Sequence, residues 1–129
     1  MNSDPVIYNT SKGHVYIDQQ GILIQTYEDN IELTFSDALE DFNLYASLCE
    51  SRKRPVMVDI RNIKSVDLKA RSYYSGEEAT KYLKAAALVI SNPVSRVIGN
   101  FYMGINKTVF PFRLFTKTEV AVEWLKSFL

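Results

Sequence analysis

The sequence predicts a single α/β domain with the element order ββαβαβαβα, in which a mixed sheet of about five strands is covered by four main helices. Two short apolar runs, residues 55–60 and 85–90, each end in turn residues, as the buried strands of an α/β sheet do. An amphipathic helical pattern over residues 35–49 precedes the first run, and further helical patterns alternate with the strands that follow. This alternation favours strands that run parallel and are connected by helices.

Composition bounds the number of domains and the class of partner. With 129 residues, of which 47% are hydrophobic and 23% charged, the chain has the size of one globular domain. We assign residues 1–13 to a polar leader and residues 14–129 to the domain. The formal net charge is zero, so we expect no nucleic-acid partner.

The charges are unevenly distributed along the chain. Residues 1–50 carry nine acids and one base, a net of −8, whereas residues 51–129 carry six acids and fourteen bases, a net of +8. Either the two halves interleave in space, or the molecule has an acidic and a basic side suited to head-to-tail contacts.

Cysteine content and hydropathy point to a cytoplasmic protein. Cys49 is the single cysteine, so it cannot form an internal disulfide, and its place on an apolar stripe predicts that it is buried. The amino terminus does not resemble a secretory signal, and the longest apolar run is far too short for a membrane span, so we expect no stable membrane insertion.

The first half of the domain begins with two strands and a helix. Residues 14–18 and 22–27 read as an antiparallel hairpin with Gly21 in the turn, followed by a brief extended segment at 31–33. Thr34 and Asp37 then have the spacing of a capping box. The apolar stripe of this helix consists of Phe35, Ala38, Leu39, Phe42, Tyr45, Ala46 and Cys49.

After the strand at 55–60, Asp67 is placed to cap a helix over 68–74, which we expect to break at Gly76 before a second helical piece that runs to Leu83. The strand at 85–90 leads to a helix with Asn92 as its cap and Pro93 in its first turn.

The last predicted elements are a strand and a helix. The strand covers residues 110–115, where Pro111 favours an edge position in the sheet. Thr116 is expected to cap the final helix, and its inward-facing residues are Val120, Trp124, Leu125 and Phe128.

Signals of catalysis are weak, so we expect neither an enzyme nor a cofactor. His14 is the only histidine, and we place it on the surface or at an edge, with no nucleophile near it in sequence. One histidine and one cysteine exclude the usual metal clusters. The glycine spacing of Gly99–Gly104 resembles that of a phosphate loop, but it lies in a predicted helix and no Lys-Ser/Thr pair follows it.

Polar side chains gather at strand exits and helix starts, where parallel α/β units usually bind ligands. Two interpretations are open for this set: a site for an anion or small polar ligand near the Pro93 helix, or an Asp–Arg pair with ordinary helix caps that fix the loops. We add Tyr73 to the candidates because the tyrosines of the broken helix, Tyr73, Tyr74 and Tyr82, are suited to a groove or a dimer contact. The complete set of candidate binding residues is Asp59, Arg61, Asp67, Tyr73, Ser91, Arg96 and Asn100.

The hairpin, the element order, the strand Val56-Met57-Val58-Asp59-Ile60 and a loop that ends in a helix-starting aspartate together resemble the STAS superfamily of anti-sigma-factor antagonists. The segments 84–89 and 91–96 and the carboxyl-terminal stretch 112–125 look like an uncharacterised bacterial STAS-like family. The resemblance implies a non-enzymatic regulatory or interaction domain whose partner is a regulatory kinase or an anti-sigma-like protein. It leaves a homodimer open.

In STAS antagonists the aspartate of this loop is followed by a serine that the partner kinase phosphorylates. Here Asp67 matches the aspartate, but Leu68 stands at the position of the acceptor serine. The resemblance therefore implies partner binding without a phosphorylation switch. A second hypothesis comes from the wider likeness to CRAL-TRIO-type domains, in which an apolar groove under the broken helix carries a small apolar or lipid-like ligand.

Overall fold

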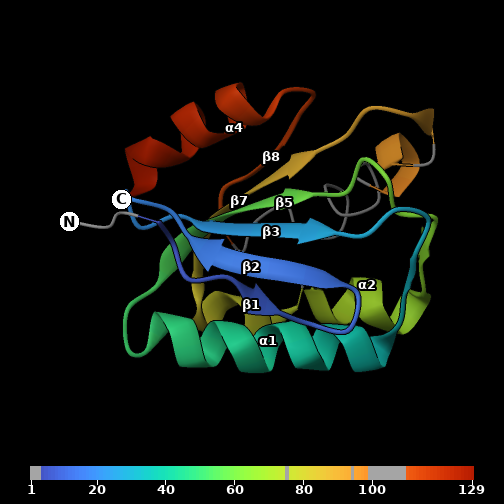
Figure 1. Cartoon of the computed structure of the whole chain (residues 1–129), viewed down its shortest axis with the longest axis horizontal. Helices are drawn as coiled ribbons and strands as arrows, with labels where there is room; N and C mark the ends of the chain where they lie inside the picture. Colours follow the sequence, from blue (N-terminus) through green and yellow to red (C-terminus); the bar gives the residue numbers. More distant parts are fainter. Residues whose placement is uncertain (1–3, 75, 94, 99–109) are drawn as a thin grey trace.

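The structure is a computed structural model and describes residues 4–74, 76–93, 95–98 and 110–129. Six strands form one mixed sheet in the order β1-β2-β3-β5-β7-β8, with α1 and α2 against one face and α4 against the other (Figure 1). This arrangement confirms the predicted fold class. The strands of the sheet are β1 (Tyr8–Asn9), β2 (Gly13–Ile17), β3 (Leu23–Tyr27), β5 (Arg54–Asp59), β7 (Leu83–Val89) and β8 (Phe112–Phe115).

The predicted hairpin is present as β2 and β3, which pair antiparallel across a turn in which Gly21 has a φ of 100°. Because L side chains rarely adopt that backbone angle, the turn requires glycine. The sheet gains a sixth strand, β1, from the stretch we interpreted as a polar leader. Its two exposed residues pair with Val15 and His14 of β2.

The strand at the centre of the sheet is β5, which pairs in parallel with β3 on one side and with β7 on the other. Because β7 also pairs in parallel with β8, four strands end at the same edge of the sheet. We call it the carboxyl edge. Loops that leave such an edge lie side by side, and this positions the candidate residues that follow Asp59 and Val89.

The helices are amphipathic and cover the sheet on both faces. On one face, α1 (Phe35–Cys49) places Phe42 and Tyr45 against Val56 of β5. On the other face, α4 (Thr118–Leu125) buries Ala121 and Leu125 against strands β3, β5 and β7. The predicted capping box begins α1, since the Thr34 hydroxyl accepts from the Asp37 N–H and the Asp37 carboxylate accepts from the Thr34 N–H.

A small second sheet fixes the loops before α1 and α2 (Leu68–Tyr74). Strand β4 (Glu32–Leu33) pairs in parallel with β6 (Ser65–Val66), and the Asp67 N–H donates to the Leu33 carbonyl at 3.0 Å. The two helices therefore start next to each other.

Three local predictions are wrong. The second helical piece is a short 3₁₀ helix, Glu77–Lys81, that ends before Leu83. Leu83 is already in β7, because pairing with Arg54 of β5 extends this strand toward the helix. Lys117, not Thr116, occupies the cap position of α4, and its side chain makes no capping bond. Leu39 and Val120 face outward, with exposed fractions of 39% and 52%, because each lies at the margin of its helix's buried stripe.

Among the described residues, no helix combines the length and the apolar character that crossing a bilayer would require.

Candidate functional site at the carboxyl edge of the sheet

The loop after β5 is held by a bidentate ion pair. The Arg61 guanidinium donates from Nε to Oδ1 of Asp59 at 3.0 Å and from Nη2 to Oδ2 at 2.7 Å, and the Arg61 N–H also donates to Oδ1 at 3.1 Å. Hydrogen bonding to Asp59 raises the pKa of Arg61 above its ordinary value, against the opposing effect of desolvation. The pair is half-exposed, so it orients the loop and adds little stability by itself.

The loop after β7 is joined to this ion pair through Asn92. The Asn92 amide donates from Nδ2 to the Arg61 carbonyl at 2.7 Å, and its Oδ1 accepts from the Ser95 N–H at 2.7 Å, which confirms Asn92 as a helix cap. The Ser95 hydroxyl accepts from the N–H groups of Ser91 and Asn92. The N–H groups of Ser91, Asn92 and Ser95 therefore already have partners within the chain.

The helix that follows β7 comprises Pro93 and residues 95–98 among the described positions, and we call it the β7-exit helix. Arg96 and Val97 are exposed on it, whereas Ser95 and Ile98 are buried. The predicted site residue Asn100, the apolar residues Val94, Phe101 and Tyr102, and the glycine pair Gly99 and Gly104 lie outside the described residues.

Asp67 caps α2 as predicted, because its Oδ1 accepts from the Ala70 N–H at 2.8 Å. Leu68, at the position of the STAS acceptor serine, has an exposed fraction of 65%. One turn later, Nε of Arg71 donates to the Val66 carbonyl at 2.9 Å.

Tyr73 lies apart from the carboxyl edge. Its ring packs edge-on against Phe35 and Phe42 of α1, at centroid distances of 5.3 and 5.2 Å. The structure thus brings Asp59, Arg61 and the start of the β7-exit helix together, whereas Tyr73 is half-buried between α1 and α2.

Two hollows flank the β7-exit helix. The first, of about 310 Å³, lies toward α4, and Arg96 and Lys117 contribute its charges. The second, of about 350 Å³, lies toward β6 and α2, and Lys64 and Arg71 contribute its charges. The remaining described residues that line the two hollows carry no carboxylate; they are Ile90, Leu114, Phe115, Thr116 and Val120 for the first, and Ser65, Val66, Pro93, Val97 and Ile98 for the second. We call the two hollows and the helix between them the basic face.

A groove of opposite charge lies between α4 and the sheet. It has a volume of about 570 Å³, and Ile24 and Met57 of the sheet and Val122 of α4 supply its apolar lining. Four carboxylates and one ammonium group also line it: Asp18, Asp59, Glu119, Glu123 and Lys126. We call it the acidic groove.

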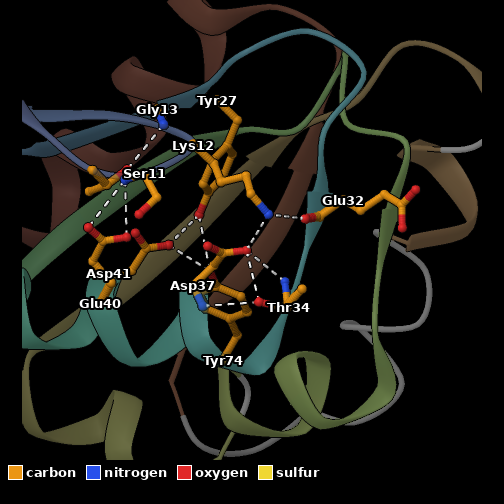
Figure 2. Close-up of polar contacts among 11 residues, drawn as sticks. Ser11, Lys12, Gly13, Tyr27, Glu32, Thr34, Asp37, Glu40, Asp41 and Tyr74 are labelled. Carbon is orange, nitrogen blue, oxygen red and sulfur yellow. Dashed lines mark hydrogen bonds and ion pairs between the residues drawn. The ribbon is translucent and has the colours of Figure 1, made fainter.

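A buried carboxylate on the α1 side of the sheet was missed by the sequence analysis. Asp41 is only 1% exposed, and its Oδ2 accepts hydrogen bonds from the hydroxyls of Tyr74 at 2.6 Å and Tyr27 at 2.7 Å (Figure 2). Desolvation raises the pKa of Asp41 to about 6, although the hydrogen bonds from Tyr74, Tyr27 and Gln25 oppose this shift. The same burial raises the pKa of both tyrosines, so their hydroxyls remain donors.

Beside this network, Lys12 ties the turn between β1 and β2 to the start of α1. Its ammonium contacts Oδ2 of Asp37 at 2.8 Å and donates to the Glu32 carbonyl at 2.7 Å (Figure 2). Burial alone would raise the pKa of Asp37, but the hydrogen bonds from Lys12 and Thr34 outweigh it and lower the pKa. These contacts are structural in character because they join neighbouring segments of the fold.

A cavity beside the buried tyrosines on the α1 side of the sheet is too small to hold the apolar ligand of the carrier hypothesis. It lies between the sheet and α1, has a volume of about 50 Å³ and is lined mainly by apolar side chains, with Tyr27, Tyr45 and Tyr74 among them. Ligand pockets in proteins usually measure roughly 300–1,000 Å³.

Other features of catalytic sites are weak in the described part of the chain. His14 is half-buried on β2, and its Nε2 lies 2.9 Å from the Thr26 hydroxyl. Cys49 is buried, as predicted, and donates to the Tyr82 carbonyl at 3.6 Å. Within the described ranges, no group of three or more His, Cys, Asp or Glu side chains could hold a metal ion.

Comparison with one solved structure agrees with this architecture. The crystal structure of an uncharacterized protein from the DUF3478 family with a SpoIIAA-like fold, from Shewanella loihica PV-4, matches with a TM-score of 0.61 at 18% identity, covering 97% of this chain and 98% of that one. The crystal structure of a protein with unknown function from Arthrobacter sp. FB24 is 27% identical and covers 91% of this chain and 94% of that one, with a TM-score of 0.35.

The first of these matches confirms the STAS-like fold. No curated protein matches the chain. A family model matches residues 15–129, nearly the whole domain. The chain therefore belongs to the family described as Domain of unknown function (DUF7793).

Proposed function

We propose that this chain is a non-enzymatic, cytoplasmic regulatory or interaction domain, and that an acidic partner protein docks on its basic face. The observation that carries the proposal is the lining of the two hollows, in which four basic side chains accompany apolar ones and none of the described lining residues is acidic. One of the four, Lys64, also pairs with Glu32 at 3.6 Å. Complementary charge steers partners together and excludes like-charged surfaces.

The basic face also offers apolar contact area. Val97 is 66% exposed between the hollows, and Val120 is 52% exposed at the rim of the first. Exposed apolar side chains that gather beside charged ones are typical of protein interaction sites. The nearby Leu68, exposed by 65%, extends this area toward the start of α2.

The position of the basic face fits the family resemblance. The loop that ends at Asp67 contributes Ser65 and Val66 to the second hollow, and the STAS resemblance implies partner contact at that loop. Leu68 replaces the acceptor serine, so we propose that regulation acts through occupancy of this face. The ion pair of Asp59 and Arg61 and the Asn92 bridge then serve to hold the two loops in register.

The proposal is tested with a charge-reversed variant, Arg96→Glu with Lys117→Glu, and a matched control, Lys53→Glu with Lys84→Glu. All four side chains are exposed, and the control pair lies near the amino ends of β5 and β7, at the opposite edge of the sheet. Each variant replaces two basic residues by glutamate, so both change the net charge equally.

The wild-type chain is used as bait in an extract of its own host, the captured protein is identified by mass spectrometry, and the purified partner is titrated calorimetrically. We expect the purified partner to bind wild type and control alike, and the basic-face variant at least about tenfold more weakly. Equal affinity for the basic-face variant, or an equal loss in the control, would overturn the proposed docking surface.

A further inference from the structure

We propose that the acidic groove of one copy of this chain receives the basic face of a second copy. The inference rests on the proposed docking surface and adds a specific occupant for it. The two surfaces are complementary. The acidic groove has carboxylates around an apolar floor, and the basic face has ammonium and guanidinium groups around the exposed Val97 and Val120. Opposite charges on complementary apolar surfaces favour association and fix its register.

The charge balance of the groove supports this pairing. Four carboxylates line it against the single ammonium of Lys126, which already pairs with Glu123 at 3.2 Å. Asp59 is partly neutralised by Arg61, and Asp18 accepts hydrogen bonds from backbone N–H groups of its own turn. Glu119 is exposed at the groove, where its carboxylate accepts from the Thr118 hydroxyl at 3.2 Å and forms no ion pair within 4 Å among the described residues.

Both surfaces can be used by one copy at the same time. Helix α4 separates them: Val120 and the preceding Lys117 line the first hollow, whereas Glu119, Val122 and Glu123 line the groove. The two linings share no residue. A groove-to-face contact therefore leaves a second groove and a second face to close a ring or extend a chain of copies.

Self-association through this contact would cover the basic face. An acidic partner protein would then compete with a second copy for the same surface, so the concentration of the chain would set how much of the basic face is free. The contact should be sensitive to salt because its charges lie on exposed side chains.

The test uses sedimentation equilibrium of three proteins. Wild type is compared with the basic-face variant, Arg96→Glu with Lys117→Glu, and with a groove variant, Glu119→Lys with Glu123→Lys. We expect the average mass of wild type to rise above the 14.8 kDa of one chain as concentration increases in about 20 mM salt, and to return toward it in about 0.5 M salt.

At the reversed positions, each variant alone places like charges on its groove and its face, so each should stay at the mass of one chain. Mixed together, the two variants restore opposite charges, and association should return. The control Lys53→Glu with Lys84→Glu should associate as wild type does. A milder variant, Glu119→Gln with Glu123→Gln, keeps the test decisive if the lysine variant does not fold, and it should weaken association at least about threefold.

Wild type that remains at the mass of one chain in low salt, or variants that associate alone, would overturn the inference. So would a mixture that stays unassociated. The groove variant separates this inference from the proposed function, because it keeps the basic face intact. If the groove variant binds the identified partner normally while wild type never self-associates, only the self-association is wrong. If wild type self-associates but the affinity for the partner does not depend on Arg96 and Lys117, only the partner docking is wrong.

Discussion

The Asn92 side chain donates to the Arg61 carbonyl at 2.7 Å, so the loops that leave two neighbouring parallel strands are held together by one amide. The opposite atom of the same amide caps the β7-exit helix. This relationship links the Asp59–Arg61 ion pair to the start of that helix and fixes the relative position of the basic face.

We expect replacements of Asn92 to separate its two roles. Asn92→Asp keeps an oxygen for the Ser95 N–H but loses the donor to Arg61, so it should cost about 1 kcal/mol of unfolding free energy. Asn92→Ala loses both contacts and should cost about 2 kcal/mol. Urea denaturation measures both values, with Ser91→Ala as the exposed control. An Asn92→Asp variant as stable as wild type would contradict the bridging role, and equal costs for Asp and Ala would contradict the capping role.

Asp67→Ala should lower the unfolding free energy by about 1 kcal/mol, because the Ala70 N–H at the start of α2 loses its acceptor. Asp67→Asn retains an acceptor oxygen and should cost less than half as much. The denaturation midpoints of the two variants provide the measurement. An unchanged midpoint in Asp67→Ala would remove the capping role and leave Asp67 to a role in binding.

The raised pKa of Asp41 predicts an unusual dependence of stability on pH. The folded protein holds this proton up to about pH 6, whereas the unfolded chain releases it near the usual aspartate pKa of about 4. The contribution of Asp41 to the free energy of unfolding is therefore full below about pH 4 and is lost as pH rises to about 6.

Asp41→Asn does not titrate, so its stability relative to wild type should rise by on the order of 2 kcal/mol between about pH 4 and pH 7. Chemical denaturation across that range measures the difference. Ser47→Ala, at an exposed and non-titrating position of the same helix, is the control and should run parallel to wild type. Parallel curves for Asp41→Asn and wild type would show that the buried carboxyl has an ordinary pKa.

We expect the start of α2 to carry no phosphate in the native protein. Leu68 lacks a hydroxyl, Ser65 is half-buried in β6, and Ser72 lies a full turn into α2, so none of them reproduces an acceptor directly after Asp67. Intact-mass and peptide mass spectrometry of protein purified from its own host is the measurement, with a synthetic phosphopeptide as the detection control. Stoichiometric phosphate on Ser65 or Ser72 would restore a shifted form of the antagonist switch.

Local sequence patterns were sufficient for the elements whose signals lie within a few residues. The apolar runs that became β5 and β7, the capping box at Thr34 and the caps at Asp67 and Asn92 depend on neighbours in the chain, and the structure confirms each of them. The short strand β1 has no such signal, because both of its residues are exposed and its existence depends on pairing with β2.

The buried polar network shows why the rest could not be read from the sequence. Asp41 follows Glu40 on a helix and looks like a solvent-facing acid, yet its burial is stabilised by Tyr27, fourteen residues earlier, and Tyr74, thirty-three residues later. Gln25 is fully buried for the same reason, since it accepts from the Tyr45 hydroxyl and donates to Asp41. The two charged surfaces likewise combine residues from distant segments, so only the folded chain assembles them.

The two outer strands of the sheet have a consequence for how this protein behaves at high concentration. At one side, β1 offers only two residues for pairing; at the other, β8 has four and follows directly after Pro111, which has no N–H to donate. Neither strand is a long, flat template onto which a foreign strand can add. Any aggregate that forms in concentrated solutions of this chain should therefore dissolve on dilution. Such solutions should also not bind dyes that report amyloid fibrils.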